Sequence, residues 1–411
     1  MGRGSAIRKG KQAWLDRTGR GRGLCVLLTL VLLASAPAMA GIVLFVPGSD
    51  QISSLGVLGI AEDIHGNLYF GTDNGLSIYN GTWHIIHRTY GVPGTGLLSD
   101  QVLAVEFDSR GDLWMGFPNG LQWIEGGTYI GVQDQQLLKS LDVHGLLLAN
   151  GKMWVATGNA GVHRYQDGTW EWFQPQGPEG LGCNYVTSMA ADSTGETVYV
   201  ACNEGIWFTK NTEEPAAFTP LAGSDLVVQP GLIVRSDPLG GIFIFNKTAI
   251  LHYNPPSDWN VIVSSPDLLP GVYINDVTMD PDGTLWIATN NGIYAWKDGK
   301  ESDHLDATAG ILNNAVKKIY LDAEDRLWFV TPGNVGFYQI SRQTSVENPA
   351  IPITTFQVPT IAPQPGGPTL PQITPAVSFN EVQENPGPIP SSPLAGILNE
   401  IAEFFGRLLP R

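Results

Sequence analysis

Basic side chains are scarce in this chain beyond its first 40 residues. Those 40 residues hold seven of the 23 lysines and arginines, but only one of the 39 acids. The rest of the chain therefore carries 16 basic and 38 acidic side chains. So negative a balance repels nucleic acid and anionic membrane surfaces. A nucleic-acid partner is not expected.

Catalytic signatures are missing as well. The sequence has no His-Glu-x-x-His segment, no Gly-x-Ser-x-Gly elbow and no phosphate-binding glycine loop. Its recurrent Asp-x-x-Gly turns offer one or two acids each, whereas a calcium loop gathers six or more oxygens on one point. We therefore expect hairpin turns here, with no metal and no cofactor. An enzyme is less expected but not excluded, because some enzymes assemble their sites from scattered residues.

Cysteine is also rare, with three residues in 411. Cys25 lies in the N-terminal segment, and Cys183 and Cys202 flank one predicted hairpin. Pairing around the turn at 192–196 places Cys202 nearer Thr187 than Cys183. The sulfur atoms would then be too far apart for a disulfide unless the loop bends. The sequence leaves open whether the two are bridged.

The N-terminus has the pattern of a secretory signal peptide over residues 1–40. A basic opening runs into an apolar stretch at 24–33 and then into small residues that end at Ala40. The alternative is an uncleaved membrane anchor, because no charge occurs between Gly23 and Asp50. Pro37 and the Ala-Met-Ala site favour cleavage. In either case the chain is expected to be secreted or extracytoplasmic, with membrane contact only if the segment stays uncleaved.

Seven aromatic residues recur at steps of 40 to 45 residues along the chain. They are Tyr69, Trp114, Trp154, Tyr199, Phe243, Trp286 and Trp328. Each lies in a unit that reads as strand, Asp-Gly turn, aromatic strand, Asn-Gly turn and two further strands. A period in the low forties with β-rich units predicts a β-propeller with about four strands per blade. The aromatic column is expected to pack between blades.

The count of units predicts an all-β, seven-bladed propeller over residues 41–343. The fifth unit is the weakest, since 246–249 replaces its Asn-Gly turn. The seventh supplies only three strands, and the strand at 42–46 is expected to complete that blade. Closure of this kind leaves the sheet without a free edge at the junction.

The C-terminal part is predicted to be separate from the propeller. Residues 344–393 are rich in proline and read as an extended linker. Residues 394–409 have apolar side chains on one helical face and form a predicted amphipathic helix. This helix is too short to span a bilayer, and we expect it to dock on the propeller or on a protein partner.

The second unit carries a family resemblance in residues 96–102, 108–116 and 119–121. These segments resemble the two-component regulator propeller repeat, and residues 275–292 match it nearly as well. In that family such repeats build the extracytoplasmic sensing region of hybrid receptors. The resemblance implies a ligand-binding or scaffolding propeller, although kinase and regulator domains are absent from this sequence. A broader likeness over 42–340 extends to streptogramin lyase-like propellers.

A binding site in such a fold is expected at the central funnel, which the inner strands and their loops line. Polar residues that interrupt the inner strands are the candidates. They are Gln101, Glu106, Asp142, His144, Arg235, Asn275, Asp276, Lys317 and Lys318. Of these, His144, Asp276 and Lys317 stand out because neighbouring units have apolar residues there. A small molecule, a glycan or a protein is the expected partner.

Three functions remain open from the sequence. The first is a non-catalytic sensor-type or protein-interaction propeller. The second is a secreted lyase or hydrolase in which His144 works with Asp276 or Glu106, with or without a divalent ion. The third is a structural protein of the cell envelope. Side chains within hydrogen-bonding reach of each other would favour the enzyme, and a dispersed channel would favour binding.

Overall fold

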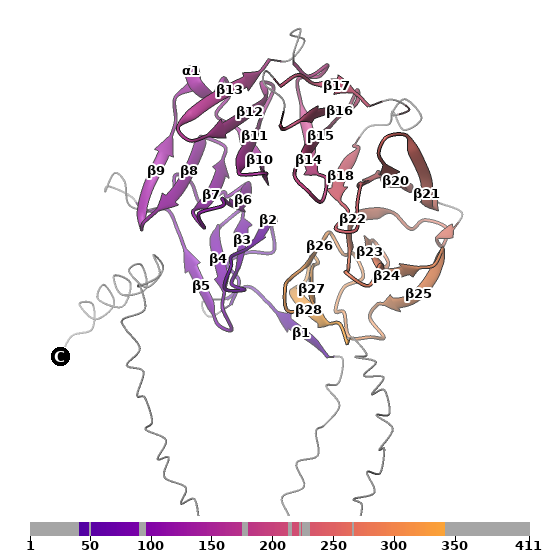
Figure 1. The fold of residues 1–411 in the computed structure, drawn as a ribbon. Coiled ribbons are helices and arrows are strands. Elements are labelled where there is room, and N and C mark those ends of the chain that lie inside the picture. Colours follow the sequence, from indigo (N-terminus) through magenta and orange to yellow (C-terminus); the bar gives the residue numbers. More distant parts are fainter. Residues whose placement is uncertain are drawn as a thin grey trace, which may run out of the picture. The chain divides into compact units, whose positions relative to one another are not determined.

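The computed structural model describes residues 41–48, 51–89, 96–174, 180–212, 216–221, 223, 231–264 and 267–341. The chain divides into two compact units, Met1–Met39 and Ala40–Arg411. The first lies outside the described residues, as do the predicted signal peptide, the linker at 344–393 and the helix at 394–409. The second contains all the strands (Figure 1).

The strands form seven antiparallel sheets of four strands each, which confirms the predicted propeller. Sheet one contains β2 (Val57–Glu62), β3 (Leu68–Thr72), β4 (Gly75–Tyr79) and β5 (Trp83–Ile86). Sheet two contains β6 (Ala104–Phe107), β7 (Leu113–Phe117), β8 (Gly120–Glu125) and β9 (Thr128–Val132). Sheet three contains β10 (Val143–Ala149), β11 (Lys152–Thr157), β12 (Gly161–Gln166) and β13 (Thr169–Phe173). A short helix, α1 (Gln135–Leu138), connects sheets two and three.

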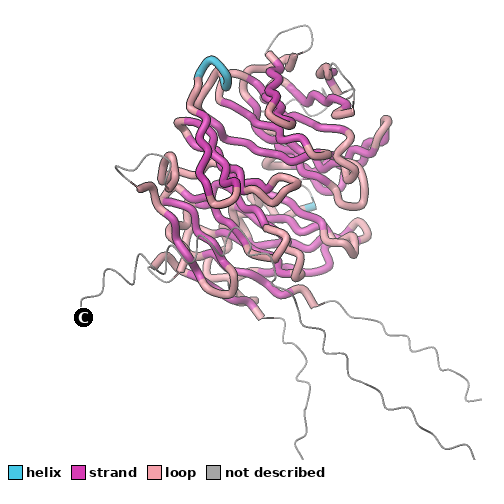
Figure 2. The backbone as a smooth tube through the Cα atoms, turned by 60° about the vertical axis from the view of Figure 1, so that its left-hand side comes forward, coloured by secondary structure: helices cyan, strands magenta, loops and turns pink. Residues whose placement is uncertain are grey.

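The remaining sheets continue the same order from inner to outer strand. Sheet four contains β14 (Val186–Ala191), β15 (Thr197–Cys202), β16 (Gly205–Lys210) and β17 (Thr219–Pro220). Sheet five contains β18 (Ile233–Ser236), β19 (Ile242–Phe245), β20 (Ala249–Asn254) and β21 (Asp258–Ser264). Sheet six contains β22 (Ile274–Met279), β23 (Leu285–Thr289), β24 (Gly292–Lys297) and β25 (Lys300–Leu305). Strands account for almost all of the described regular structure (Figure 2).

Sheet seven joins the two ends of the propeller. Its strands are β26 (Lys318–Leu321), β27 (Arg326–Val330), β28 (Val335–Gln339) and, at the outside, β1 (Ile42–Phe45). β1 pairs antiparallel with β28, with Ile42 opposite Tyr338 and Phe45 opposite Val335. The predicted closure by the N-terminal strand is therefore confirmed, and β1 in indigo lies beside β28 in orange in Figure 1.

The hydrophobic core lies between the sheets. Each of the seven interfaces between neighbouring sheets holds one buried apolar cluster, including the interface of sheets seven and one. Trp114 of sheet two contacts Tyr165 of sheet three with ring centroids 5.2 Å apart, and Phe70 contacts Trp328 across the closing interface at 5.4 Å. The aromatic column thus packs between blades, as predicted.

The Asp-Gly turns have a structural role that the sequence shows only in part. Asp108, Asp280 and Asp322 each accept hydrogen bonds from two backbone N–H groups, two and four residues later. The second carboxylate oxygen of each accepts from the indole N–H of the column tryptophan six residues on, at 3.3, 3.0 and 2.7 Å. These carboxylates hold the turn against the aromatic strand, which agrees with their prediction as turn residues.

The Asp-Gly turn of sheet five has a different side-chain partner, because the column residue there is phenylalanine. Phe243 has no N–H to donate, so the carboxylate of Asp237 cannot make the bond found in the tryptophan units. Instead, Nε2 of His252 on the next strand lies 2.8 Å from Oδ2 of Asp237. This contact raises the pKa of His252. His252 thus takes the place of the column tryptophan as the side chain that contacts the Asp237 carboxylate.

Gly71 lies at a close approach between sheets one and two. A Cβ added at Gly71 on β3 would lie 2.9 Å from the carbonyl oxygen of Val102, which leads into the next inner strand. We expect Gly71→Val to lower the free energy of unfolding by about 2–3 kcal/mol, because the side chain forces two sheets apart. Urea denaturation would measure this loss. Gly48→Val is the control, because a Cβ there meets nothing within 4 Å. Equal losses in both variants would contradict the close approach of the sheets.

Cys183 and Cys202 form a disulfide. The strand register does place Cys202 opposite Val186, three residues beyond Cys183. The segment before β14 bends back, however, and brings the two Cα atoms to 6.3 Å. The loop bend that the register argument required for a bridge is therefore present, because Cys183 lies in the loop and not in the strand. Both cysteines are buried between sheets three and four.

Candidate functional site

The inner strands of all seven sheets line one central channel of about 480 Å³. Its wall consists largely of backbone and apolar side chains such as Leu58, Val105 and Met189. Charged groups interrupt this wall at a few positions only.

Five of the nine candidate residues line this channel. They are Glu106, His144, Arg235, Asp276 and Lys318. The other four lie outside its lining: Gln101, Asp142, Asn275 and Lys317. Gln101 and Lys317 are exposed. The set of residues predicted for the funnel therefore includes four that do not line the channel.

Irregular pairing near the start of the inner strands affects two of the candidates, His144 and Asn275. The ladder skips Leu58, His144, Thr187 and Asn275, so these residues lie in register shifts typical of β-bulges. Such a bulge turns the side chain out of the regular alternation. A polar residue at this position is therefore free to reach the neighbouring sheet.

Three of these side chains bridge to the next sheet. Nε2 of His144 donates to the carbonyl of Val186 at 2.8 Å, since a carbonyl can only accept. The hydroxyl of Thr187 donates to Leu232 O at 2.5 Å, and the amide of Asn275 donates to Val316 O at 2.7 Å. Each bond spans 41 to 45 residues, the length of one unit. The polar breaks at His144 and Asn275 thus connect sheets, a role that the sequence analysis missed.

His144 has no catalytic partner among the described residues. Its ring stacks on Tyr185, with centroids 5.2 Å apart and planes at 12°. Its Nδ1 atom is buried without a hydrogen bond. Asp276 pairs with Arg235, and Glu106 accepts hydrogen bonds from backbone N–H groups. The arrangement does not join His144 to either carboxylate by a hydrogen bond.

An ionic cluster lies where sheets five, six and seven meet the channel. Nε and Nη2 of Arg235 on β18 contact Oδ1 of Asp276 on β22, at 3.1 and 3.0 Å. Asp276 is 4% exposed, and Oδ2 lies 3.4 Å from the backbone N–H of Ile319 on β26. Lys318, the preceding residue, also lines the channel, and burial lowers the pKa of its ammonium. The cluster brings two cations and one carboxylate together.

A separate acidic region lies at Glu106 on β6. Burial raises the pKa of this carboxyl to about 7, although the backbone N–H groups of Phe107 and Leu148 oppose the shift. Oε1 accepts from Phe107 N at 3.0 Å. Tyr320 lines the same channel, and its pKa is raised by burial and by nearby Glu62 and Glu106. Tyr320 was not among the candidates, because its alternation with Ile319 reads as ordinary strand patterning.

Metal-binding groups do not occur in the described part of the chain, where no three His, Cys, Asp or Glu side chains gather suitably. The helices of the described residues are likewise too short or too polar to cross a membrane.

The comparison with known families finds one match. Residues 268–291 match the family model described as two component regulator propeller. This segment covers the loop into β22, the Asp280 turn and β23. The two-component regulator propeller resemblance is confirmed there, close to the stretch at 275–292. No curated protein has significant sequence similarity to this chain.

Solved structures share the fold at low identity. One is the extracellular domain of the hybrid two component system BT4673 from B. thetaiotaomicron, with 18% identity and a TM-score of 0.58, covering 73% of this chain and 40% of that one. Another is virginiamycin B lyase from Staphylococcus aureus, with 13% identity and a TM-score of 0.55, covering 73% and 100%. A third is YCF48 bound to D1 peptide, with 15% identity and a TM-score of 0.54, covering 74% and 96%.

These likenesses establish the propeller fold and no more. The chain spans about 40% of the length of the first structure named. Sensor domain, lyase and peptide-binding protein share this architecture, so function has to be argued from the channel itself.

Proposed function

We propose that this chain is an exported, non-catalytic propeller that binds a ligand in its central channel, in the manner of a sensor domain. The observation that carries the proposal is the channel itself. All seven inner strands line a space of about 480 Å³, into which charged groups from several sheets extend. A concave site toward which a few polar groups converge is a usual form of small-molecule site.

The arrangement of the polar groups supports binding over catalysis. An acid–base pair should lie within hydrogen-bonding reach of each other or of a shared substrate atom. Here His144 donates to a backbone carbonyl, and Asp276 pairs with Arg235. These groups hold neighbouring sheets together, and the remaining donors are available for a ligand.

Export is supported by two features. Residues 1–40 have the pattern of a signal peptide. The disulfide between Cys183 and Cys202 fits an oxidising compartment. The solved extracellular domain from B. thetaiotaomicron has the same fold, and its name agrees with this location.

Blocking the channel tests the proposal. Thr278 lines it, and Thr278→Trp should fill much of the space. A thermal-shift screen of sugars, peptides and divalent ions against residues 41–411 should find a ligand that raises the Tm of the parent chain but not of this variant. Thr169→Trp, on the exposed outer strand β13, is the control and should keep the shift.

Two results would contradict the proposal. A ligand shift that survives in Thr278→Trp would place binding outside the channel. Turnover of the ligand, abolished by His144→Ala, would support the lyase or hydrolase alternative.

A further inference from the structure

Positive and negative side chains are unevenly distributed around the channel. Arg235 and Lys318 come from sheets five and seven, which flank sheet six and its Asp276. One carboxylate therefore faces two cations. Glu106, the other acid in the lining, has a pKa of about 7 and is only partly ionised at neutral pH. The cluster of Arg235, Lys318 and Asp276 therefore carries a local positive excess, and Glu106 lies apart from it on sheet two.

Donors in this cluster remain available. The guanidinium of Arg235 has five N–H groups, of which three contact Asp276 or the carbonyl oxygen of Val234. The ammonium of Lys318 has three N–H groups and makes no hydrogen bond within the described part of the chain. Burial disfavours its charge, and only Asp276 opposes this effect. An anion beside Lys318 would stabilise the charged ammonium.

The net charge of the cluster indicates the class of anion that would bind to it. The formal charge of the Arg235, Lys318 and Asp276 cluster is +1, and this is an upper limit because burial disfavours the charge of Lys318. A monoanionic carboxylate therefore suits the cluster better than a phosphate dianion. A planar carboxylate also suits the fork of N–H groups on a guanidinium. The channel, at about 480 Å³, has room for a molecule of disaccharide size.

We propose that Lys318 and the free N–H groups of Arg235 form a subsite for the carboxylate of a small acidic ligand. This inference rests on the proposed function, since it assumes that the channel is a binding site. Asp276 is the positioning residue, because it holds Arg235 and lies between the two cations.

Paired small molecules test the inference. Each pair has one acid and a neutral analogue of similar shape: glucuronate with glucose, succinate with succinamide, and N-acetylglutamate with N-acetylglutamine. We expect the acid of at least one pair to bind about tenfold more tightly than its analogue, as measured by titration calorimetry at pH 7 and 0.15 M salt.

Adjacent lysines provide the matched variants. Lys318→Met should abolish the preference for the acid, whereas Lys317→Met should keep it, because Lys317 is exposed and outside the channel lining. Both variants should retain the Tm of the parent chain, which separates loss of binding from loss of folding.

The outcomes distinguish this inference from the proposed function. Equal binding of acid and neutral molecules, blocked by Thr278→Trp, would overturn the carboxylate subsite and leave the channel as a binding site. A preference that survives in Lys318→Met would also overturn the subsite. Absence of any channel-dependent binding across the pairs would count against both.

Discussion

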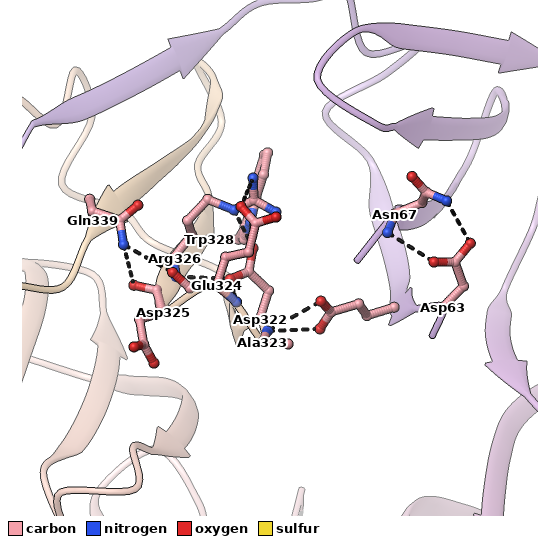
Figure 3. Close-up of polar contacts among 10 residues, drawn as sticks. Asp63, Asn67, Asp322, Ala323, Glu324, Asp325, Arg326, Trp328 and Gln339 are labelled. Atoms are coloured by element: carbon pink, nitrogen blue, oxygen red, sulfur yellow. Dashed lines mark hydrogen bonds and ion pairs between the residues drawn. The ribbon is translucent and has the colours of Figure 1, made fainter. Parts of the chain in front are cut away.

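Replacement of Asp322 by alanine is expected to lower the free energy of unfolding by about 3–5 kcal/mol. The carboxylate is fully buried and accepts from Nε of Arg326 at 2.5 Å and from Nε1 of Trp328 at 2.7 Å. Figure 3 draws this network at the turn of sheet seven. Without the carboxylate, an indole N–H and two backbone N–H groups lose their acceptor, and the guanidinium of Arg326 keeps only its ion pair with Glu324 at 2.8 Å.

The position of this turn adds to the effect. The neighbouring backbone N–H of Ala323 donates to both carboxylate oxygens of Glu62 on β2, at 3.2 and 3.0 Å. This contact crosses the interface that closes the propeller (Figure 3). A disturbed turn would therefore weaken the closure as well as sheet seven.

Asp63 offers a matched control in sheet one. It occupies the same position in its turn, but its side-chain partners are Asn67 and the hydroxyl of Tyr69, which are neutral. Asp63→Ala should cost about 1–2 kcal/mol, because no buried charge is left unpaired. Urea denaturation of both variants provides the comparison. Equal losses would show that the ion pair of Asp322 contributes little.

The second large effect concerns pH. Burial raises the pKa of Glu106 from 4.5 to about 7 in the folded chain. Between these values the folded state binds more protons than the unfolded state, so stability falls as pH rises through this window. The shift corresponds to about 3 kcal/mol at most, and the open channel reduces it to about 2 kcal/mol.

Glu106→Gln removes this dependence, because the amide resembles the protonated carboxyl. We expect the variant and the parent chain to have equal stability near pH 4.5, and the variant to be about 2 kcal/mol more stable at pH 8. Chemical denaturation at both pH values measures the difference. Glu301→Gln, on the exposed strand β25, is the control. A Glu106→Gln variant that is no more stable than the parent at pH 8 would contradict a buried, protonated Glu106.

The fold was largely predictable because its packing repeats in the sequence. One aromatic residue per unit fills each interface between sheets, so its spacing counts the sheets directly. The final pairing of β1 followed from the three strands of the last unit. The Cys183–Cys202 bridge was not predictable from register, since it depends on the bend of a loop.

The site was predictable only in part. Arg235, Asp276 and Lys318 interrupt apolar strands and do line the channel. His144 and Asn275 interrupt strands for another reason, because the bulges at these positions turn polar side chains toward the next sheet. A sequence shows that a polar residue breaks an apolar pattern, but not whether its partner is a ligand or a backbone carbonyl.

The pairing of β1 with β28 has a consequence for folding kinetics. Residues 42–45 pair with residues 335–338, so the contact that closes the propeller joins segments separated by nearly its whole sequence. Contacts of such separation form late and slowly. During synthesis or export, the first strand is expected to remain unpaired until the last sheet has emerged. The propeller therefore closes only after β28 has been synthesised, and a chain that ends before β28 leaves a sheet edge exposed.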